Sequence, residues 1–331
     1  MRALSFTRRG DAETRLSRST AGHLAMTPDL DRILRAAGDA ADDAIELAET
    51  ALALGAADMP DLVLDTYRRH LARIAADVGA RALALDEPHK AHAGGDPVQR
   101  EAALTRARAQ ALADVIAGDF GYDGDRVTYD DMANANLVRV IDRKRGLPVA
   151  LGLIYIHAGR VNGWAVSGVN FPGHFLVRLN GVVQGGPPPV MIDPFAGGRV
   201  LDEDAVTALL ARMQGLDDEH DDAPTQADIN QAMAPVSARA VLLRLQNNIF
   251  SRAMQARDTA RASAILARMT AIAPRDPTLW LERGQLDGDS GNLMSARTAY
   301  ARAAELALAE GRGQIAREAK ARADRLRMSL N

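Results

Sequence analysis

A histidine and an aspartate lie at the ends of two short apolar runs near the middle of the chain, in the segments NFPGHFLVRLNG (170–181) and MIDPFAGG (191–198). His174 opens the first run and Asp193 closes the second. In many acyl-transfer enzymes a histidine oriented by an aspartate is the general base that deprotonates a nucleophilic side chain. The two residues therefore raise the hypothesis of an enzyme whose nucleophile lies elsewhere in the chain.

The nucleophile is the missing part of this hypothesis. The chain has no cysteine, which excludes a thiol nucleophile, a disulfide and a thiolate metal site. The nearby hydroxyls are those of Thr128, Tyr155 and Ser167, and Tyr155 would more naturally pack inside a buried helix. The sequence contains no glycine-rich phosphate loop, paired metal-binding histidines or serine elbow, so we predict no cofactor and no bound metal.

Composition and charge narrow the class of protein further. A formal charge of −3 and an isoelectric point near 6.2 give no overall basic character, which argues against a nucleic-acid partner. No run approaches the roughly 20 apolar residues that cross a bilayer, so we expect no membrane partner. The lack of cysteine suits a reducing cytoplasm, which is the predicted location.

Helical spacing of apolar residues predicts that the first part of the chain is α-helical. The pattern begins at Thr27, which can cap a helix, and Pro28 fits the first turn. Further helices are predicted over about 62–79 and 98–116, with the Pro- and Gly-containing segment 86–97 as a loop.

The middle of the chain changes character. A short helix is predicted to end at Gly146, and a second helix, apolar on nearly all sides and therefore buried, to run from Pro148 to Gly163. Three strand-like segments separated by Gly and Pro follow: WAVSGVNF, HFLVRLNG and PVMIDPF. Helices followed by consecutive strands predict an α+β domain with an antiparallel sheet.

The strand that follows His174 should present two different faces. His174 and Arg178 are four residues apart and fall on one face, whereas Phe175 and its alternating apolar neighbours predict the core. If the next strand lies alongside, Asp193 can meet His174 across the pair. That face could bind a carboxylate or a peptide. Alternatively the imidazole and the carboxylate satisfy each other in a purely structural pair.

Two charged segments have simple structural interpretations. The basic cluster DRKRG (142–146) stands at the end of a predicted helix, where it can satisfy the last carbonyls and the helix dipole. The acidic, turn-rich segment 215–236 predicts a solvated linker. A metal site is the alternative there, and it would use Asp217, Asp218, His220 and Asp221.

The C-terminal part is helical and repeats with a period of 34 residues, which resembles the tetratricopeptide repeat. Such stacks usually present a surface to a protein or peptide partner. The small or bulky residues that recur are Ala262, Leu266 and Met269 in one unit and Ala296, Tyr300 and Ala303 in the next. The expected organisation is a disordered tail (1–26, with Met26 as an alternative start), a domain (27–214), the linker (215–236) and the helical repeats (237–331).

Three motifs in order, DRKRGLPVALGLIY, NFPGHFLVRL and IDPFAGG, closely resemble the bacterial SirB-type transglutaminase-like proteins. The resemblance covers about residues 30–215, and a tetratricopeptide-like tail follows in those proteins as it does here. It implies a transglutaminase-like, papain-like α+β fold. The wider group works with a Cys–His–Asp triad whose thiolate begins a buried helix.

The resemblance also assigns positions in the site. His174 matches the family's histidine and Asp193 its aspartate. The nucleophile falls at Pro148, and other SirB-type members place a serine near Ala150, but neither residue here carries a nucleophilic atom. Asn134 matches an asparagine that precedes the short helix and is expected to cap it.

We therefore expect a pseudoenzyme, a non-catalytic module that binds a peptide or protein through the vestigial cleft and the helical repeats. The candidate binding residues are Asn134, Pro148, Ala150, Asn170 and Arg178. The competing hypothesis is a hydrolase or amide-acting enzyme in which His174 acts as general base towards water and Asp193 orients it. The sequence names neither a partner nor an oligomeric state.

Overall fold

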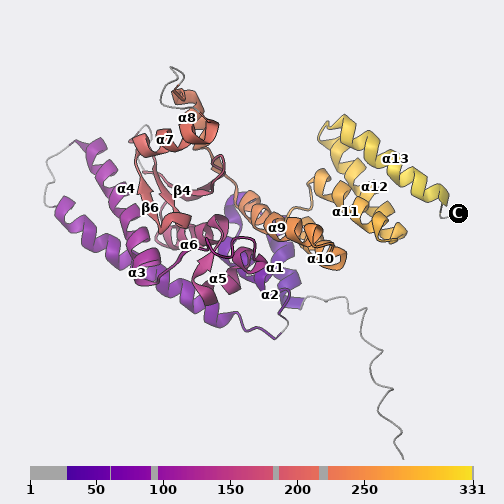
Figure 1. Cartoon of the computed structure of the whole chain (residues 1–331), viewed down its shortest axis with the longest axis horizontal. Helices are drawn as coiled ribbons and strands as arrows, with labels where there is room; N and C mark the ends of the chain where they lie inside the picture. Colours follow the sequence, from indigo (N-terminus) through magenta and orange to yellow (C-terminus); the bar gives the residue numbers. More distant parts are fainter. Residues whose placement is uncertain (1–27, 60, 91–95, 182–185, 216–222, 330–331) are drawn as a thin grey trace, which may run out of the picture.

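The computed structural model describes residues 28–59, 61–90, 96–181, 186–215 and 223–329 (Figure 1). A five-stranded antiparallel sheet, in the order β6-β5-β4-β3-β7, lies at the centre of the larger part of the molecule. The three predicted strand segments form neighbouring strands of this sheet, as expected. Its strands are β3 (Val166–Val169), β4 (Leu176–Leu179), β5 (Val190–Asp193), β6 (Arg199–Leu201) and β7 (Pro235–Val236).

The two faces of the sheet are covered by different helices. Helix α6 (Pro148–Val161) packs on one face, and α7 (Glu203–Gln214) and α8 (Gln226–Ala232) pack on the other. Side chains alternate along the strands accordingly, because successive residues of a strand point to opposite faces. Towards α6 point Phe175, Val177, Leu179 and Ile192, whereas Val169, Leu176, Met191 and Leu201 pack with α7 and α8.

Helix α6 is the central element that the sequence predicted. Pro148 occupies its first turn, where the missing N–H is not needed, and the chain leaves the helix at Gly163 with a φ of 74°. The helix is buried on nearly all sides because it contacts the sheet, α3 and α9. This position explains why its sequence is apolar all round.

Helices N-terminal to α6 wrap the rest of the core. They are α1 (Pro28–Asp39), α2 (Leu47–Ala56), α3 (Asp65–Lys90), α4 (Pro97–Ala113) and α5 (Leu137–Arg143). Short turns join them, namely η1 (Asp42–Ala44), the π-helical η2 (Asp114–Asp119) and η3 (Met132–Ala135), and a small parallel pair forms from β1 (Asp123–Gly124) and β2 (Arg145–Gly146).

Two predicted helix boundaries in this region were wrong. Helix α3 extends to Lys90, into the first part of the segment 86–97 that was predicted to be a loop. Helix α5 ends at Arg143 and not at Gly146. Lys144 adopts the left-handed conformation, with a φ of 57°, and directs the chain into β2.

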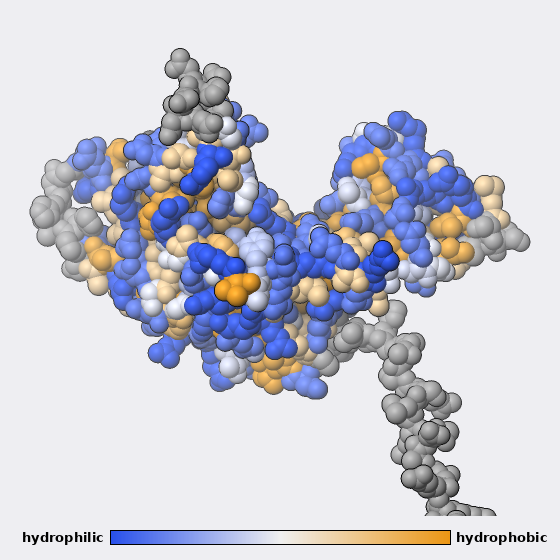
Figure 2. Space-filling view, viewed as in Figure 1, coloured by the Kyte–Doolittle hydropathy of each residue, from blue (hydrophilic) through white to orange (hydrophobic). Residues whose placement is uncertain are grey.

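Five helices complete the chain as predicted for its C-terminal part. They are α9 (Ala238–Gln255), α10 (Thr259–Ile272), α11 (Pro277–Asp289), α12 (Leu293–Ala309) and α13 (Gly313–Ser329). All six residues of the 34-residue period are buried. Helices α11 to α13 form a lobe that stands apart from the sheet, and Figure 2 shows a broad notch between this lobe and the part that contains the sheet.

The predicted linker contains regular secondary structure. Its second half forms α8 and then β7, which pairs with β3 at the edge of the sheet. These elements were missed because a seven-residue helix and a two-residue strand have too few residues for a periodic pattern. In the described part of the chain, no helix is long and apolar enough to cross a membrane.

Candidate functional site

His174 lies in a tight turn immediately before β4. Its backbone N–H donates to the carbonyl of Phe171 at 2.9 Å, and Gly173 supplies the left-handed conformation, with a φ of 68°, that this turn requires. The His174 side chain is partly buried. Within the described residues its imidazole makes no hydrogen bond and no ion pair.

Asp193 closes β5 and is 5% exposed. Its carboxylate Oδ1 accepts the backbone N–H groups of Phe195 at 2.9 Å and of Ala196 at 3.2 Å. Asp193 is therefore the N-cap of the short 3-10 helix η4 (Pro194–Ala196). The hydrogen-bond donors to this carboxylate therefore come from its own IDPFAGG segment and not from His174.

The two candidate residues lie at the same end of neighbouring strands. Strands β4 and β5 are antiparallel, with Val177 opposite Ile192, so the start of β4 is next to the end of β5. The predicted strand arrangement is thus confirmed. However, no hydrogen bond or ion pair joins His174 to Asp193 in the part of the chain that the structure describes. The structural imidazole–carboxylate pair that the sequence suggested is therefore not formed.

The positions that the resemblance assigns to the nucleophile carry no reactive side-chain atom. Pro148 and Ala150 lie in the first turn of α6, and Ala150 is 0% exposed. Further along α6, the hydroxyl of Tyr155 is buried without a hydrogen-bond partner. Burial, followed by the nearby Asp123 and Asp193 carboxylates, raises the pKa of Tyr155. A phenol that holds its proton so firmly is a poor nucleophile at neutral pH.

Neither of the other two hydroxyls is hydrogen-bonded to an effective base among the described residues. Thr128 donates to the carboxylate of Asp125 at 2.6 Å, and hydrogen bonds from the Thr128 side chain and backbone lower the pKa of Asp125 to about 2. A carboxylate with this pKa is too weak a base to activate an alcohol. Ser167 lies on β3, and its buried hydroxyl has no partner among the described residues.

Arg178 does not point freely into a binding face. Its Nε donates to Asn180 Oδ1 at 2.8 Å, and its Nη1 donates to the carbonyl of Met233 at 2.7 Å. Burial lowers the pKa of this guanidinium. Arg178 therefore ties β4 to the end of α8, so the predicted role as an anchor for a carboxylate ligand loses its support.

The predicted helix cap was assigned to the wrong asparagine. Asn134 lies in η3 with a 0% exposed side chain, and its Nδ2 donates to the carbonyl of Thr128 at 2.6 Å. The residue that caps α5 is Asn136, whose side chain accepts the N–H of Arg139 and donates to Gly55. Two asparagines two residues apart can both precede a helix, and only the backbone conformation decides between them.

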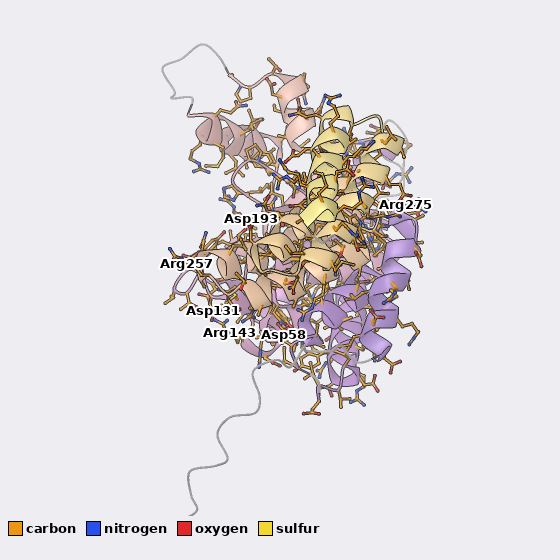
Figure 3. The ribbon with its side chains drawn as sticks, turned by 90° about the vertical axis from the view of Figure 1, so that its right-hand side faces the viewer. Asp58, Asp131, Arg143, Asp193, Arg257 and Arg275 are labelled. Atoms are coloured by element: carbon orange, nitrogen blue, oxygen red, sulfur yellow. The ribbon has the colours of Figure 1, made fainter. Side chains whose placement is uncertain are left out.

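The basic cluster DRKRG satisfies one carbonyl at the end of α5 as predicted, since Arg145 donates to the carbonyl of Lys144 at 2.8 Å, but its other side chains diverge. Arg143 pairs with Asp125 at 2.8 Å and with Asp131 at 3.3 Å. Figure 3 shows Asp131 and Arg143 side by side, with Asp193 above them. Lys144 turns instead towards α3, and Arg145 donates to the carbonyl of Gly121. The cluster thus connects three separate parts of the domain.

Arg244 on α9 is a residue that the sequence did not single out. Its Nη1 donates to Asn170 Oδ1 at 2.6 Å, and its Nη2 donates to the carbonyl of His174 at 3.1 Å. The guanidinium also lies 5.4 Å from the centre of the Phe175 ring. Arg244 therefore clamps the NFPGH turn onto α9. The contacts join residues 70 and 74 positions apart, so no local pattern could have indicated them.

A groove of about 550 Å³ runs along α9 next to this clamp. Asn170 from the NFPGH turn and Asp130 line it on one side, but neither His174 nor Asp193 does. The α9 residues that line the groove are Ala240, Leu243, Arg244, Asn247, Asn248, Ser251, Arg252 and Gln255. Asn170 is the one predicted binding residue that it contains.

No group of three or more acidic, histidine or cysteine side chains among the described residues could hold a metal ion. The acidic alternative at Asp217, Asp218, His220 and Asp221 lies outside the described residues.

Comparison with known proteins identifies the family. The model of the transglutaminase-like superfamily matches residues 65–247, which is more than half of the chain. The chain belongs to the transglutaminase-like superfamily. The matched transglutaminase-like region continues through α8 and β7 into α9, beyond the predicted domain end at residue 214.

Curated relatives match part of the chain. A UPF0162 protein of Xylella fastidiosa is 30% identical over 189 residues, which cover 56% of this chain and 63% of the relative. A UPF0162 protein of Vibrio cholerae is 31% identical over 173 residues, or 52% of this chain and 56% of the relative. The human F-box only protein 21 is 30% identical over 91 residues, which are 26% of this chain and 14% of that protein.

The matched part of the chain thus spans about 56 to 63% of the length of these UPF0162 relatives. No solved structure matches the chain. The SirB-type assignment and the tetratricopeptide character of the tail stay predictions.

Proposed function

We propose that this chain is a non-catalytic member of the transglutaminase-like superfamily that binds an extended peptide segment of a partner protein. The groove along α9 is the binding site, and the clamped NFPGH turn forms one of its walls. The observation that carries the proposal is a row of unpaired polar side chains on α9 at the spacing of an extended peptide.

The row consists of Asn247, Ser251 and Gln255, which are exposed and four residues apart. Among the described residues none of the three side chains makes a hydrogen bond. Four residues of an α-helix rise by about 6 Å. Two residues of an extended strand advance by about 6.7 Å. Each of these side chains can both donate and accept, so the row can bond the N–H and C=O groups of alternate peptide residues.

The charge along the groove favours a peptide with acidic side chains. Arg244 and Arg252 line it, and Asp130 is the acidic residue that lines it. Asp130 forms an ion pair with Arg252 at 3.3 Å, whereas Arg244 contacts neutral acceptors and burial lowers its pKa. A peptide carboxylate near Arg244 would compensate a partly desolvated guanidinium.

The lack of a usable nucleophile supports the non-catalytic part of the proposal. The first turn of α6 carries Pro148 and Ala150, the Thr128 hydroxyl donates to the weakly basic carboxylate of Asp125, and burial raises the pKa of Tyr155. The hydrolase alternative, with His174 as general base, requires an orienting carboxylate. Asp193 instead caps η4, so no contact in the described structure favours that alternative.

Selection from a random decapeptide display library on the full chain tests the proposal. The selected peptides are then titrated by fluorescence anisotropy against the wild type and a variant that combines Asn247→Ala, Ser251→Ala and Gln255→Ala. We expect an enrichment of acidic residues and at least about a tenfold loss of affinity in the variant, since three hydrogen bonds of about 1 kcal/mol each are removed.

The matched control replaces two exposed amide side chains on α8, with Gln226→Ala and Asn230→Ala. Its affinity should equal that of the wild type. Equal binding by the α9 variant, or a selection that enriches no peptide, would contradict the proposal. Hydrolysis of a selected peptide that His174→Ala abolishes would favour the enzyme instead.

A further inference from the structure

A second cluster of titratable side chains lies away from the His174 turn and the α9 groove. It consists of His70 on α3, Tyr122 before β1, and Lys144 at the end of α5. The three polar atoms form a triangle. His70 Nε2 lies 2.8 Å from the Tyr122 hydroxyl and 2.9 Å from Lys144 Nζ, and Lys144 Nζ lies 2.9 Å from the Tyr122 hydroxyl.

The hydrogen-bond donors and acceptors of the three side chains pair with one another when Lys144 is a neutral amine. An ammonium group can only donate, so a charged Lys144 would compete with the Tyr122 hydroxyl for the single lone pair on His70 Nε2. The Tyr122 proton has no other acceptor among the described residues, and Tyr122 is 1% exposed. A neutral amine accepts from Tyr122 and donates one of its two protons to His70, so the buried Tyr122 proton has a partner.

The surroundings of the triangle also favour the neutral form of the Lys144 amine. Burial lowers the pKa of Lys144, while the more distant Asp142 opposes this. Asp142 accepts a hydrogen bond from Tyr67 and forms no ion pair with Lys144 in the described structure. Burial is the largest cause that lowers the pKa of His70, and it favours a neutral imidazole that can accept a proton at Nε2.

The residue type at position 144 is also unusual for this chain. Of its 40 basic residues only three are lysines, at 90, 144 and 320. Arginine cannot lose its proton in a protein, whereas lysine can. The backbone holds Lys144 firmly, since its N–H donates to Val140 and its carbonyl accepts from Asp123. Lys144 thus sits in a fixed, left-handed backbone position between a base and a phenol.

We propose that Lys144 is a reactive amine that condenses with small carbonyl compounds, in particular aldehydes, to form a reversible imine. His70 and Lys144 are partly exposed, so the amine is open to solvent on one side and the carbonyl compound must be small. This site is separate from the α9 groove and does not depend on the function proposed for that groove.

The three residues supply the acid and the base that the condensation needs. The Lys144 nitrogen attacks the carbonyl carbon, His70 Nε2 takes a proton from that nitrogen, and the Tyr122 hydroxyl gives one to the carbonyl oxygen. His70 then returns its proton to Tyr122 through their 2.8 Å contact. The carbinolamine loses its hydroxyl as water after protonation by Tyr122, the second nitrogen proton passes to His70, and the net products are an imine and one water.

Labelling of the full-length chain with propanal, trapped by sodium cyanoborohydride at pH 7, tests the proposal by peptide mass spectrometry. The exposed Lys320 is an internal control on the same molecule. We expect Lys144 to be alkylated at least about ten times faster than Lys320, because each unit by which a lysine pKa falls gives about tenfold more neutral amine. The rate at Lys144 should also reach its plateau at a lower pH.

Two variants separate reactivity from simple exposure. Tyr122→Phe keeps the ring and removes the proton donor, so the rate at Lys144 should fall about tenfold while the rate at Lys320 stays unchanged. Tyr67→Phe is the matched control, because its hydroxyl bonds Asp142 and does not touch the triangle. It should leave both rates unchanged, and a thermal melt of each variant confirms that the chain remains folded.

The opposite results would overturn the proposal. Lys144 labelled no faster than Lys320 in the folded wild type would mean an ordinary, charged lysine. An unchanged rate in Tyr122→Phe would remove the phenol from the chemistry. Acetylation of Lys144 by acetyl phosphate, with no reaction towards propanal, would assign the site to acyl donors and contradict the carbonyl assignment.

Discussion

The turn at His174 and the triangle at Lys144 are two histidine-containing regions of one domain, and they differ in what their polar groups do. At the end of the sheet, Asp193 caps a short helix, Arg178 holds α8, and Arg244 clamps the turn. At the triangle, the three side chains contact one another at 2.8 to 2.9 Å. Resemblance to a family drew attention to the first region, whereas only geometry reveals the second.

The first region is distinguished by tight packing around its motif residues. The Phe175 ring next to His174 lies between two glycines on different elements, Gly152 on α6 and Gly168 on β3. A Cβ at either glycine would lie 2.5 Å from an atom of that ring. The motif residues here are therefore explained by packing, and the predictions that follow test this explanation.

The largest effect is expected from Gly152→Ala. The added methyl group collides with the Phe175 ring, which cannot move away because Gly168 borders its other side. We expect the free energy of unfolding to fall by about 1–3 kcal/mol, measured by urea denaturation. Gly118→Ala is the control, because a Cβ there meets nothing within 4 Å and stability should be kept. Equal stability of the two variants would show that the ring is loosely packed.

A smaller effect is expected when the His174–Asp193 relationship is tested by a double-mutant cycle. Asp193→Ala leaves the N–H groups of Phe195 and Ala196 without their acceptor and should cost about 1–2 kcal/mol. His174→Ala should cost less, because the imidazole has no hydrogen-bond partner in the described structure. The coupling free energy should stay below about 0.5 kcal/mol. A coupling above about 1 kcal/mol would mean that the two side chains do form a pair.

The smallest effect concerns the pH dependence of stability at the triangle. The pKa of His70 lies below its ordinary value of 6.5, so at mildly acidic pH the unfolded chain binds this proton more readily than the folded chain. Stability should therefore fall as the pH drops below about 6.5. His70→Gln should flatten the dependence of the unfolding free energy between about pH 5 and pH 7.

Some of this slope should persist in the variant, because burial also lowers the pKa of His157. His157→Gln serves as the comparison, since it should leave the His70 contribution in place. A steeper loss of stability in acid for His70→Gln than for the wild type would contradict the direction of the His70 shift.

The sequence predicted the elements whose patterns are long or strongly punctuated. The apolar run after Pro148 became the buried helix α6, and the strand segments around His174 and Asp193 became neighbouring strands. The errors arose where a local rule had two solutions. Both Asn134 and Asn136 could cap α5, and both Arg143 and Gly146 could end it. In each case the backbone conformation, which depends on contacts outside the segment, made the choice.

The sequence by itself determined that the chain has no thiol, that its core is helix-rich, and that an antiparallel sheet follows a buried helix. These properties depend on composition and on periodicity over neighbouring residues. Only the tertiary structure decided which side chains meet. His70 and Lys144 are 74 residues apart, and Arg244 and His174 are 70 apart. Such contacts follow from how α3, α5, α9 and the sheet pack together, and hydrogen bonds between distant residues leave no periodic trace in the sequence.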